Sequence, residues 1–258
     1  MDESLFDNLS AQEVRSSPSV NVELDQAKIS WEKRRKVLEW VVKVHGRMSL
    51  QSEVLWLAVD IFHRFISSGV EPNNSAYHSG LTALWLAAKI EGQHPERYRL
   101  RHFARHIDDR GRTRRRMVRE EAQILDVLQF RVGAYVPPTF WVQHIVAAGG
   151  HDQYTLRTAL VLVDVTAAEP CFSTWYPKEL ASMAMLIACK MKGREWDDTD
   201  ARVSGWEEQE MLPGANLLLA FLRSDDFRQS WMYQKFSSEG QLYLGDVVRG
   251  WALAHPTI

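Results

Sequence analysis

An all-α fold of two similar helical units is predicted by three features of the sequence. First, LWLAAKIEG (84–92) realigns with MLIACKMKG (185–193), and each is an apolar run closed by Lys, an apolar residue, a charged residue and Gly. Second, AVDIF (58–62) is echoed by LVDVT (162–166) at a similar offset, which is too long for a solenoid repeat. Third, apolar residues recur every three to four positions, and no segment has the alternation of a strand.

The first unit is predicted to follow a short helix near residues 3–13 and an extended arm. Helix signals start at Trp31 and continue through WEKRRKVLEWVVKVHGR (31–47). Ser49 is the expected N-cap of the next helix, whose apolar residues keep helical spacing and which stops at Gly69.

A third helix is predicted to lie at the centre of this unit. Ser75 can cap it, and it ends at Gly92. Its sequence is apolar nearly all round, which is typical of a helix that is covered on every side. A charged segment follows, and REEAQILDVLQF (119–130) then predicts another helix.

The second unit repeats this scheme after Pro137 and Pro138. Pro177 stands at a first-turn position, where proline is favoured, and it starts the helix that we expect at the centre of this unit. VLVDV is predicted to be helical because it lies inside a longer periodic run. The expected helices cover 137–150, 153–170, 176–193, 207–223 and 243–254.

Composition indicates a globular chain without a membrane span. The 258 residues are 45% hydrophobic, enough to bury one large core or two smaller ones. The net charge of −2 provides no global attraction to nucleic acid or to an anionic membrane. Cys171 and Cys189 are too few for a disulfide framework and fit a reducing compartment. The N-terminus lacks the basic-then-apolar order of a signal peptide.

Motifs of catalysis and cofactor binding are absent from the sequence. It has no glycine-rich phosphate loop, Cys-x-x-Cys, His-Glu-x-x-His or Gly-x-Ser-x-Gly. His102 and His106 have a spacing that could hold a metal, but no third ligand on a defined element accompanies them. We therefore expect neither metal nor cofactor. Residues 97–119 contain ten Arg. They form either a surface for nucleic acid or phosphate or a solvated loop, and the overall charge of the chain favours the loop.

Six segments along the chain carry a resemblance to a known family. They are ISWEKRRKVLEWVVKVH, SEVLWLAVDIFHRFIS, LTALWLAAKIEG, EEAQILDVLQF, SGWEEQEMLPG (204–214) and QKFSSEGQLYLGDVVRGWA (234–252). In order and spacing they resemble those of a B-type (mitotic) cyclin of the fungal kind. The resemblance covers nearly the whole chain. It implies two tandem five-helix cyclin folds, with an N-terminal helix and arm over 1–30, a first cyclin box over 31–136 and a second cyclin fold over 137–258.

The resemblance implies a regulatory subunit rather than an enzyme. Cyclins bind a cyclin-dependent serine/threonine kinase as a heterodimer and hold its mobile C-helix inward, which activates it. A mitotic member would control G2/M progression, with kinase substrates or inhibitors as further partners and a location in nucleus and cytoplasm. Lys89 and Glu121 resemble the charged anchors of kinase docking, although both also suit the helix macrodipole at their positions.

One structural ion pair of the family is altered in this chain. The family usually pairs an Arg of the first helix with an Asp of the second. Here Arg34 is kept, but the Asp position is His63. Asp60 lies one turn earlier on nearly the same helical face. We therefore predict that Asp60 is the partner of Arg34 and that His63 is neutral beside them.

The substrate-docking patch of the family is also altered. Its positions on the first helix are Lys33, Val37 and Trp40, and a Glu that usually flanks the patch is Lys43. Two basic residues at a site that receives an Arg-x-Leu peptide should weaken or redirect its binding.

Two other interpretations stay open. A general transcription factor of the IIB type shares the double cyclin fold and binds DNA. Such a factor favours a zinc ribbon and a basic chain, which this sequence lacks, but the arginine-rich segment is compatible with it. A cyclin fold that acts as a scaffold without activating a kinase is compatible with His63 and Lys33.

Overall fold

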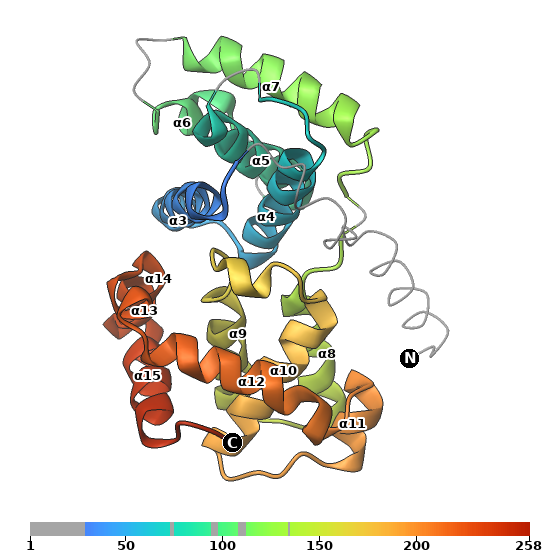
Figure 1. Ribbon diagram of the computed structural model, residues 1–258, viewed down its shortest axis with the longest axis vertical. Coiled ribbons are helices and arrows are strands. Elements are labelled where there is room, and N and C mark those ends of the chain that lie inside the picture. Colours follow the sequence, from blue (N-terminus) through green and yellow to red (C-terminus); the bar gives the residue numbers. More distant parts are fainter. Residues whose placement is uncertain (1–28, 73–74, 94–97, 108–111, 134) are drawn as a thin grey trace. The chain divides into compact units, whose positions relative to one another are not determined.

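The computed structural model describes residues 29–72, 75–93, 98–107, 112–133 and 135–258 (Figure 1). All regular structure in these ranges is helical, which confirms the predicted all-α class. The chain divides into two compact units between Tyr135 and Val136. The predicted helix near 3–13 and the arm after it lie outside the described residues. No helix in the described ranges is long and apolar enough to cross a membrane.

The first unit is built around α5 (Ala76–Glu91), the helix that was predicted to be central. Its alanines Ala83, Ala87 and Ala88 are completely buried, and their small side chains allow neighbouring helices to approach closely. The helices that contact α5 are α3 (Trp31–Arg47), α4 (Ser52–Ser67), α6 (Leu100–Ala104) and α7 (Thr113–Val127).

Gly80 marks a close approach between α3 and α5. A Cβ atom at this position would lie 2.8 Å from Val37 Cγ1 and 2.9 Å from Val41 Cγ2. Both distances are shorter than the usual separation of about 3.5–4.0 Å between carbon atoms in contact. Only glycine therefore fits here without displacing α3.

Two helix starts in the first unit differ from the prediction. Ser49 was expected to cap α4, but its φ is 51° and Gln51 is the residue that precedes the helix. α7 begins at Thr113 rather than near 119. The arginine run has good helix propensity, and it places Met117 in the core, so both local preference and packing extend the helix toward its N-terminus.

The second unit is built around α10 (Pro177–Met191), in which Pro177 occupies the first turn as predicted. α10 contacts α8, α9, α11 and α12. The other elements of this unit are α8 (Pro138–Gly149), α9 (Gln153–Asp164), η3 (Pro170–Phe172), α11 (Asp198–Ser204), α12 (Glu208–Arg223), α13 (Asp225–Gln229), α14 (Trp231–Phe236), η4 (Glu239–Gln241) and α15 (Leu244–Ala254).

Three short helices of the second unit were missed in the sequence. Asp197, Ser224 and Ser230 accept hydrogen bonds from backbone N–H groups at the starts of α11, α13 and α14. Such N-caps are visible in a sequence, but the helices are too short to show an apolar period. The predicted helix over 153–170 is also too long, since α9 ends at Asp164, where local turns take over.

Candidate functional site

Lys89 and Glu121 lie together at the surface of the first unit. Lys89 stands in the last turn of α5, and its Nζ donates a hydrogen bond to Glu121 Oε1 on α7. Their side chains are 37% and 19% exposed. The structure thus brings together, from two helices, the two residues that the sequence singled out. We call them the anchor pair.

Trp85 holds the lysine of the anchor pair in place. The Nζ atom of Lys89 lies 3.9 Å from the centroid of the Trp85 ring, which is within the range of a cation–π interaction. The indole Nε1–H of Trp85 donates to the backbone oxygen of Tyr98 at 3.0 Å. This role of Trp85 was not predicted, although a position four residues before Lys89 on a helix is the expected place for such a contact.

A buried hydrogen bond sets the position of Glu121. Ser79 Oγ on α5 donates to Glu120 Oε1 on α7, and both residues are completely buried. Of the two adjacent glutamates, one therefore points into the core and the other toward the surface. A buried charged or polar group needs such a partner, so this contact fixes how α7 is rotated against α5.

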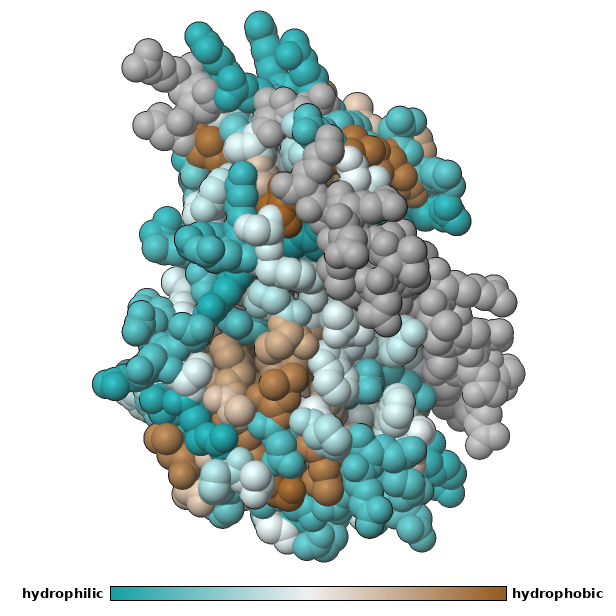
Figure 2. Space-filling view, in the orientation of Figure 1, coloured by the Kyte–Doolittle hydropathy of each residue, from teal (hydrophilic) through white to brown (hydrophobic). Residues whose placement is uncertain are grey.

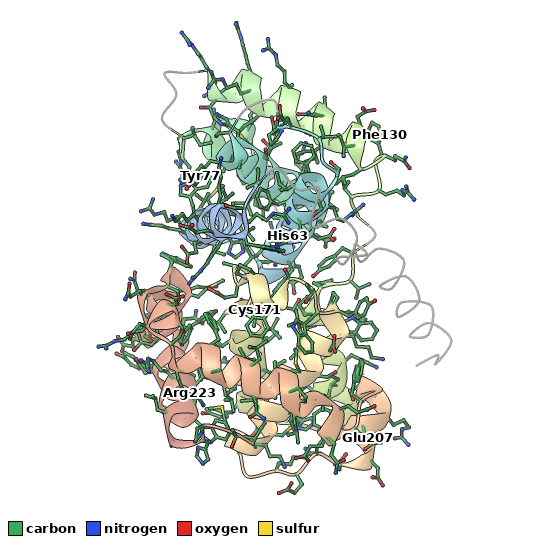
Figure 3. All side chains as sticks on the ribbon, in the orientation of Figure 1. His63, Tyr77, Phe130, Cys171, Glu207 and Arg223 are labelled. Atoms are coloured by element: carbon green, nitrogen blue, oxygen red, sulfur yellow. The ribbon has the colours of Figure 1, made fainter. Side chains whose placement is uncertain are left out.

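Exposed apolar side chains accompany the anchor pair. Ile90 directly follows Lys89 and is 41% exposed, and Val118, one turn before Glu121 on α7, is 49% exposed. Phe130, labelled in Figure 3 beyond the end of α7, is 72% exposed and has a φ of 58°. Protein–protein interfaces combine an apolar core with a charged and polar rim, and the surface of α5 and α7 offers both kinds of side chain.

The predicted pair between Arg34 and Asp60 is not formed, so that prediction was wrong. Arg34 is 2% exposed, and its guanidinium donates to Ile29 O at 3.2 Å and to Ser67 Oγ at 3.4 Å. Asp60 Oδ2 instead accepts from Arg64 Nη1 at 3.0 Å. Arg64 lies one turn after Asp60 on the same helix, so this pair forms without any approach between helices.

Burial changes the ionisation of both Asp60 and His63. Burial raises the pKa of Asp60 to about 6, although the charge of Arg64 opposes this shift. Burial, together with the charge of Arg34, lowers the pKa of His63 to about 3. The lowered pKa keeps His63 neutral near pH 7, and its ring lies 6.0 Å from that of Trp31.

One of the four positions of the predicted docking patch lies in the core, and the other three are accessible. Val37 is completely buried beneath α5, so its assignment to the patch was wrong. Lys33 and Lys43 are exposed. Trp40 is half-buried, and its ring meets that of Tyr77 edge-on, with centroids 5.4 Å apart. The accessible part of the patch is therefore basic with one aromatic edge.

A second polar cluster lies in the second unit, where His151, Cys189 and Asp200 bring their ligand atoms within 4.8 Å of one another. His151 Nε2 lies 2.7 Å from Asp200 Oδ1, and its Nδ1 lies 3.1 Å from Arg194 Nη1. Burial raises the pKa of the Cys189 thiol to about 12. Both ring nitrogens of His151 already have protein partners, and one partner is a cation. The cluster therefore ties the connection between α8 and α9 to α10 and α11 rather than preparing a metal site.

Two family models cover most of the chain. Residues 4–133 match the cyclin N-terminal domain, and residues 136–244 match the cyclin C-terminal domain. The G2/mitotic-specific cyclin cdc13 of Schizosaccharomyces pombe is 27% identical over 96% of this chain and 50% of its own length. The G2/mitotic-specific cyclin-4 of Candida albicans is 29% identical over 90% of this chain and 47% of its own length. The chain thus spans about half the length of these relatives.

Solved structures share the fold at low sequence identity. A viral cyclin from herpesvirus saimiri aligns with a TM-score of 0.72 at 15% identity, covering 82% of this chain and 93% of the other. A chain of the yeast RNA Pol II CTD kinase CTDK-1 complex aligns with a TM-score of 0.61 at 15% identity, covering 84% and 73%.

Proposed function

Because the chain belongs to the cyclin family, we propose that it is a regulatory subunit that binds and activates a cyclin-dependent serine/threonine kinase during G2/M progression. The mitotic cyclins among its relatives support this class of activity. The chain itself would supply no catalytic group. All of the chemistry would take place on the kinase, which gains a correctly placed C-helix from the complex.

The anchor pair is the observation that carries this proposal. Two opposite charges from different helices meet at a surface with exposed apolar neighbours. In the free chain they neutralise each other, and in a complex each can turn to a group of the kinase. The ion pair and the Trp85 ring hold both side chains close to the positions from which they would bind, which lowers the entropy lost on association.

A charge exchange tests this role while it preserves the fold. In the double variant Lys89→Glu, Glu121→Lys the ion pair within the chain can still form, but a kinase meets the opposite charges. Desolvated charges at an interface contribute roughly 2–5 kcal/mol, so the Kd for the kinase should rise at least about thirtyfold. Kinase binding and phosphorylation of histone by the complex would be measured.

A second exchange provides the control. Glu32 and Lys36 form an exposed ion pair on α3 with 2.6 Å between Lys36 Nζ and Glu32 Oε1. The variant Glu32→Lys, Lys36→Glu should bind and activate the kinase like the wild type. Wild-type activation by the Lys89/Glu121 exchange would show that these two residues are not the anchors.

The alternative interpretations give other results in the same assays. A scaffold would bind a kinase without raising its activity, and a transcription factor of the IIB type would bind promoter DNA and no kinase. We further propose that the chain is present in both nucleus and cytoplasm, which imaging of a fluorescently tagged chain through the cell cycle would test.

A further inference from the structure

The first two turns of α7 present an unusual surface of arginines. Arg112 precedes the helix, and Arg114, Arg115 and Arg119 follow on its exposed sides, while Met117 faces the core. Figure 3 shows nitrogen-tipped side chains that project from α7 into the surrounding space. In Figure 2 teal, hydrophilic side chains project from the end of the view that holds α6 and α7, with brown, hydrophobic patches beside them.

The short helix α6, which contacts α7, adds further exposed arginines. No lysine occurs between residues 97 and 119. None of the exposed arginines of α6 and α7 forms an ion pair with a carboxylate in the described part of the chain. We call this set the arginine face: Arg99, Arg101, Arg105, Arg112, Arg114, Arg115 and Arg119.

The stability of α7 does not explain the arginine face. The N-terminus of a helix carries partial positive charge, so cations in the first turn are unfavourable there. The first turn of α7 contains no acidic residue, and no side chain caps it. Arg112 occupies the N-cap position, where Ser, Thr, Asp or Asn would be preferred. These arginines therefore lower the stability of the helix that carries them. An anionic ligand would neutralise their charge, so the arginine face is suited to binding one.

The choice of arginine over lysine indicates phosphate. A guanidinium presents two parallel N–H groups that match two oxygens of a phosphate, whereas an ammonium acts as a point charge. If these residues served only to keep the surface soluble, lysine would be equally effective at their positions.

The surroundings favour a short peptide over a nucleic acid. The whole chain carries a net charge of −2, so attraction of a long polyanion is confined to this face. Single-stranded nucleic acid also needs aromatic platforms for its bases. The aromatic residues of the described segment 98–119 are Tyr98, which is half-buried, and Phe103, which is completely buried.

The helix also sets a spacing for the ligand. Arg112, Arg115 and Arg119 fall on one side of α7. At 1.5 Å per residue, Arg112 and Arg119 are separated by roughly 10 Å along the axis. An extended peptide covers that distance in about three residues, at 3.3 Å each.

We propose that the arginine face binds a peptide segment carrying two phosphorylated residues three positions apart. The side chains of Arg112, Arg115 and Arg119 contact the phosphates, and α6 extends the basic surface. This binding needs only the chain itself, so it stands or falls independently of kinase activation.

Fluorescence anisotropy with the full chain tests the proposal. The probe is a labelled twelve-residue peptide with phosphoserines at positions five and eight, and the same peptide without phosphate is the reference. A version with the phosphoserines at positions two and eleven tests the spacing. A twelve-base-pair DNA duplex and a single strand of equal length compete at the same ionic strength.

Two matched variants locate the binding. Arg112→Gln, Arg115→Gln, Arg119→Gln removes the central stripe. Arg157→Gln, Arg202→Gln, Arg228→Gln removes the same charge from exposed positions elsewhere. Circular dichroism and thermal unfolding of both show that they are folded, and the first should be no less stable than the wild type, because it relieves the unfavourable charge at the start of α7.

The expected result is binding of the doubly phosphorylated peptide, at least tenfold weaker binding of the widely spaced one, and at least tenfold weaker binding by the α7 variant but not by the control. Equal binding by both variants would overturn the proposal. So would absence of binding at physiological ionic strength. Tighter binding of either DNA probe than of the phosphopeptide would identify a nucleic-acid surface instead and would also overturn it.

Discussion

Replacing Gly80 by alanine should destabilise the first unit, even though alanine is the better helix former. Gly80 lies in the interior of α5, where exchange of Gly for Ala alone favours the helix by about 1 kcal/mol. The added Cβ, however, would lie 2.8 Å and 2.9 Å from methyl groups of Val37 and Val41. Two opposing effects therefore act at this one position, and the packing decides the sign.

The magnitude follows from the stiffness of the neighbours. Valine in a helix has one strongly preferred rotamer, so neither methyl group can turn away and α3 must move as a whole. Overpacking of a core typically costs about 1–3 kcal/mol. With two close contacts we expect a cost in the upper half of that range. After the gain in helix propensity, the net loss in the free energy of unfolding should be about 1–2 kcal/mol.

Gly250 provides the matched control. It lies within α15, and a Cβ built there meets no atom within 4 Å. Gly250→Ala should therefore stabilise the chain, by up to about 1 kcal/mol. Adding Val37→Ala to Gly80→Ala should recover part of the loss, because it removes one of the two close contacts.

Chemical denaturation of the full chain, followed by circular dichroism, measures all of these variants. Two units can unfold separately, so the transitions of each variant would be fitted individually. If Gly80→Ala raises the midpoint as Gly250→Ala does, the close approach of α3 and α5 is absent and the prediction is wrong. It is also wrong if Val37→Ala is no less damaging in the Gly80→Ala background than in the wild type.

Three further predictions concern the other sites. The folded-state pKa of Asp60 is raised to about 6 from 3.8, so its stabilising contribution is complete below the lower value and is lost as the pH rises through the higher one. The folded-state pKa of His63 is lowered to about 3 from 6.5, so its contribution is present above the higher value and is lost as the pH falls. From about pH 4 to pH 6 the unfolding free energy of Asp60→Asn minus that of the wild type should therefore rise, and the same difference for His63→Asn should fall. Parallel curves of unfolding free energy against pH for all three proteins would contradict this. Trp85→Phe should weaken kinase binding about two- to fivefold by loosening the anchor lysine, and unchanged affinity in a binding titration would remove Trp85 from the site. An Arg-x-Leu peptide should bind weakly or not at all, and the variant Lys33→Met, Lys43→Glu should raise its affinity; low-micromolar binding to the wild type would contradict this.

The sequence was a good guide wherever a pattern extends over several turns. Three such patterns were the long apolar run of α5, the proline in the first turn of α10 and Gly69, which follows the end of α4 with a positive φ. Each reflects a preference of the residues for a helix or for its end, and the helices follow them. The surface position of Lys89 and Glu121 came from resemblance, since nothing in the spacing of two residues 32 positions apart predicts that they meet.

Polar partners were less predictable because several carboxylates and cations compete within one turn. Asp60 can pair with Arg34 on another helix or with Arg64 on its own helix. Its side chain would leave α4 on nearly the same face in either case, so the sequence does not decide between the two partners. The structure selects the local pair. Val37 was misplaced for a related reason. The apolar spacing of its helix predicts a buried face. How many residues that face includes depends on Gly80 in α5, which allows α3 and α5 to approach so closely.

The opposite directions of Glu120 and Glu121 constrain how this region can evolve. One residue added to or removed from α7 ahead of Glu120 would rotate the rest of the helix by about 100°. Glu120, the partner of Ser79, would then leave the core, and Glu121 would leave its surface pair with Lys89. Insertions and deletions within this helix should therefore be eliminated, because one change in length removes both the buried contact of Glu120 with Ser79 and the surface pair of Glu121 with Lys89.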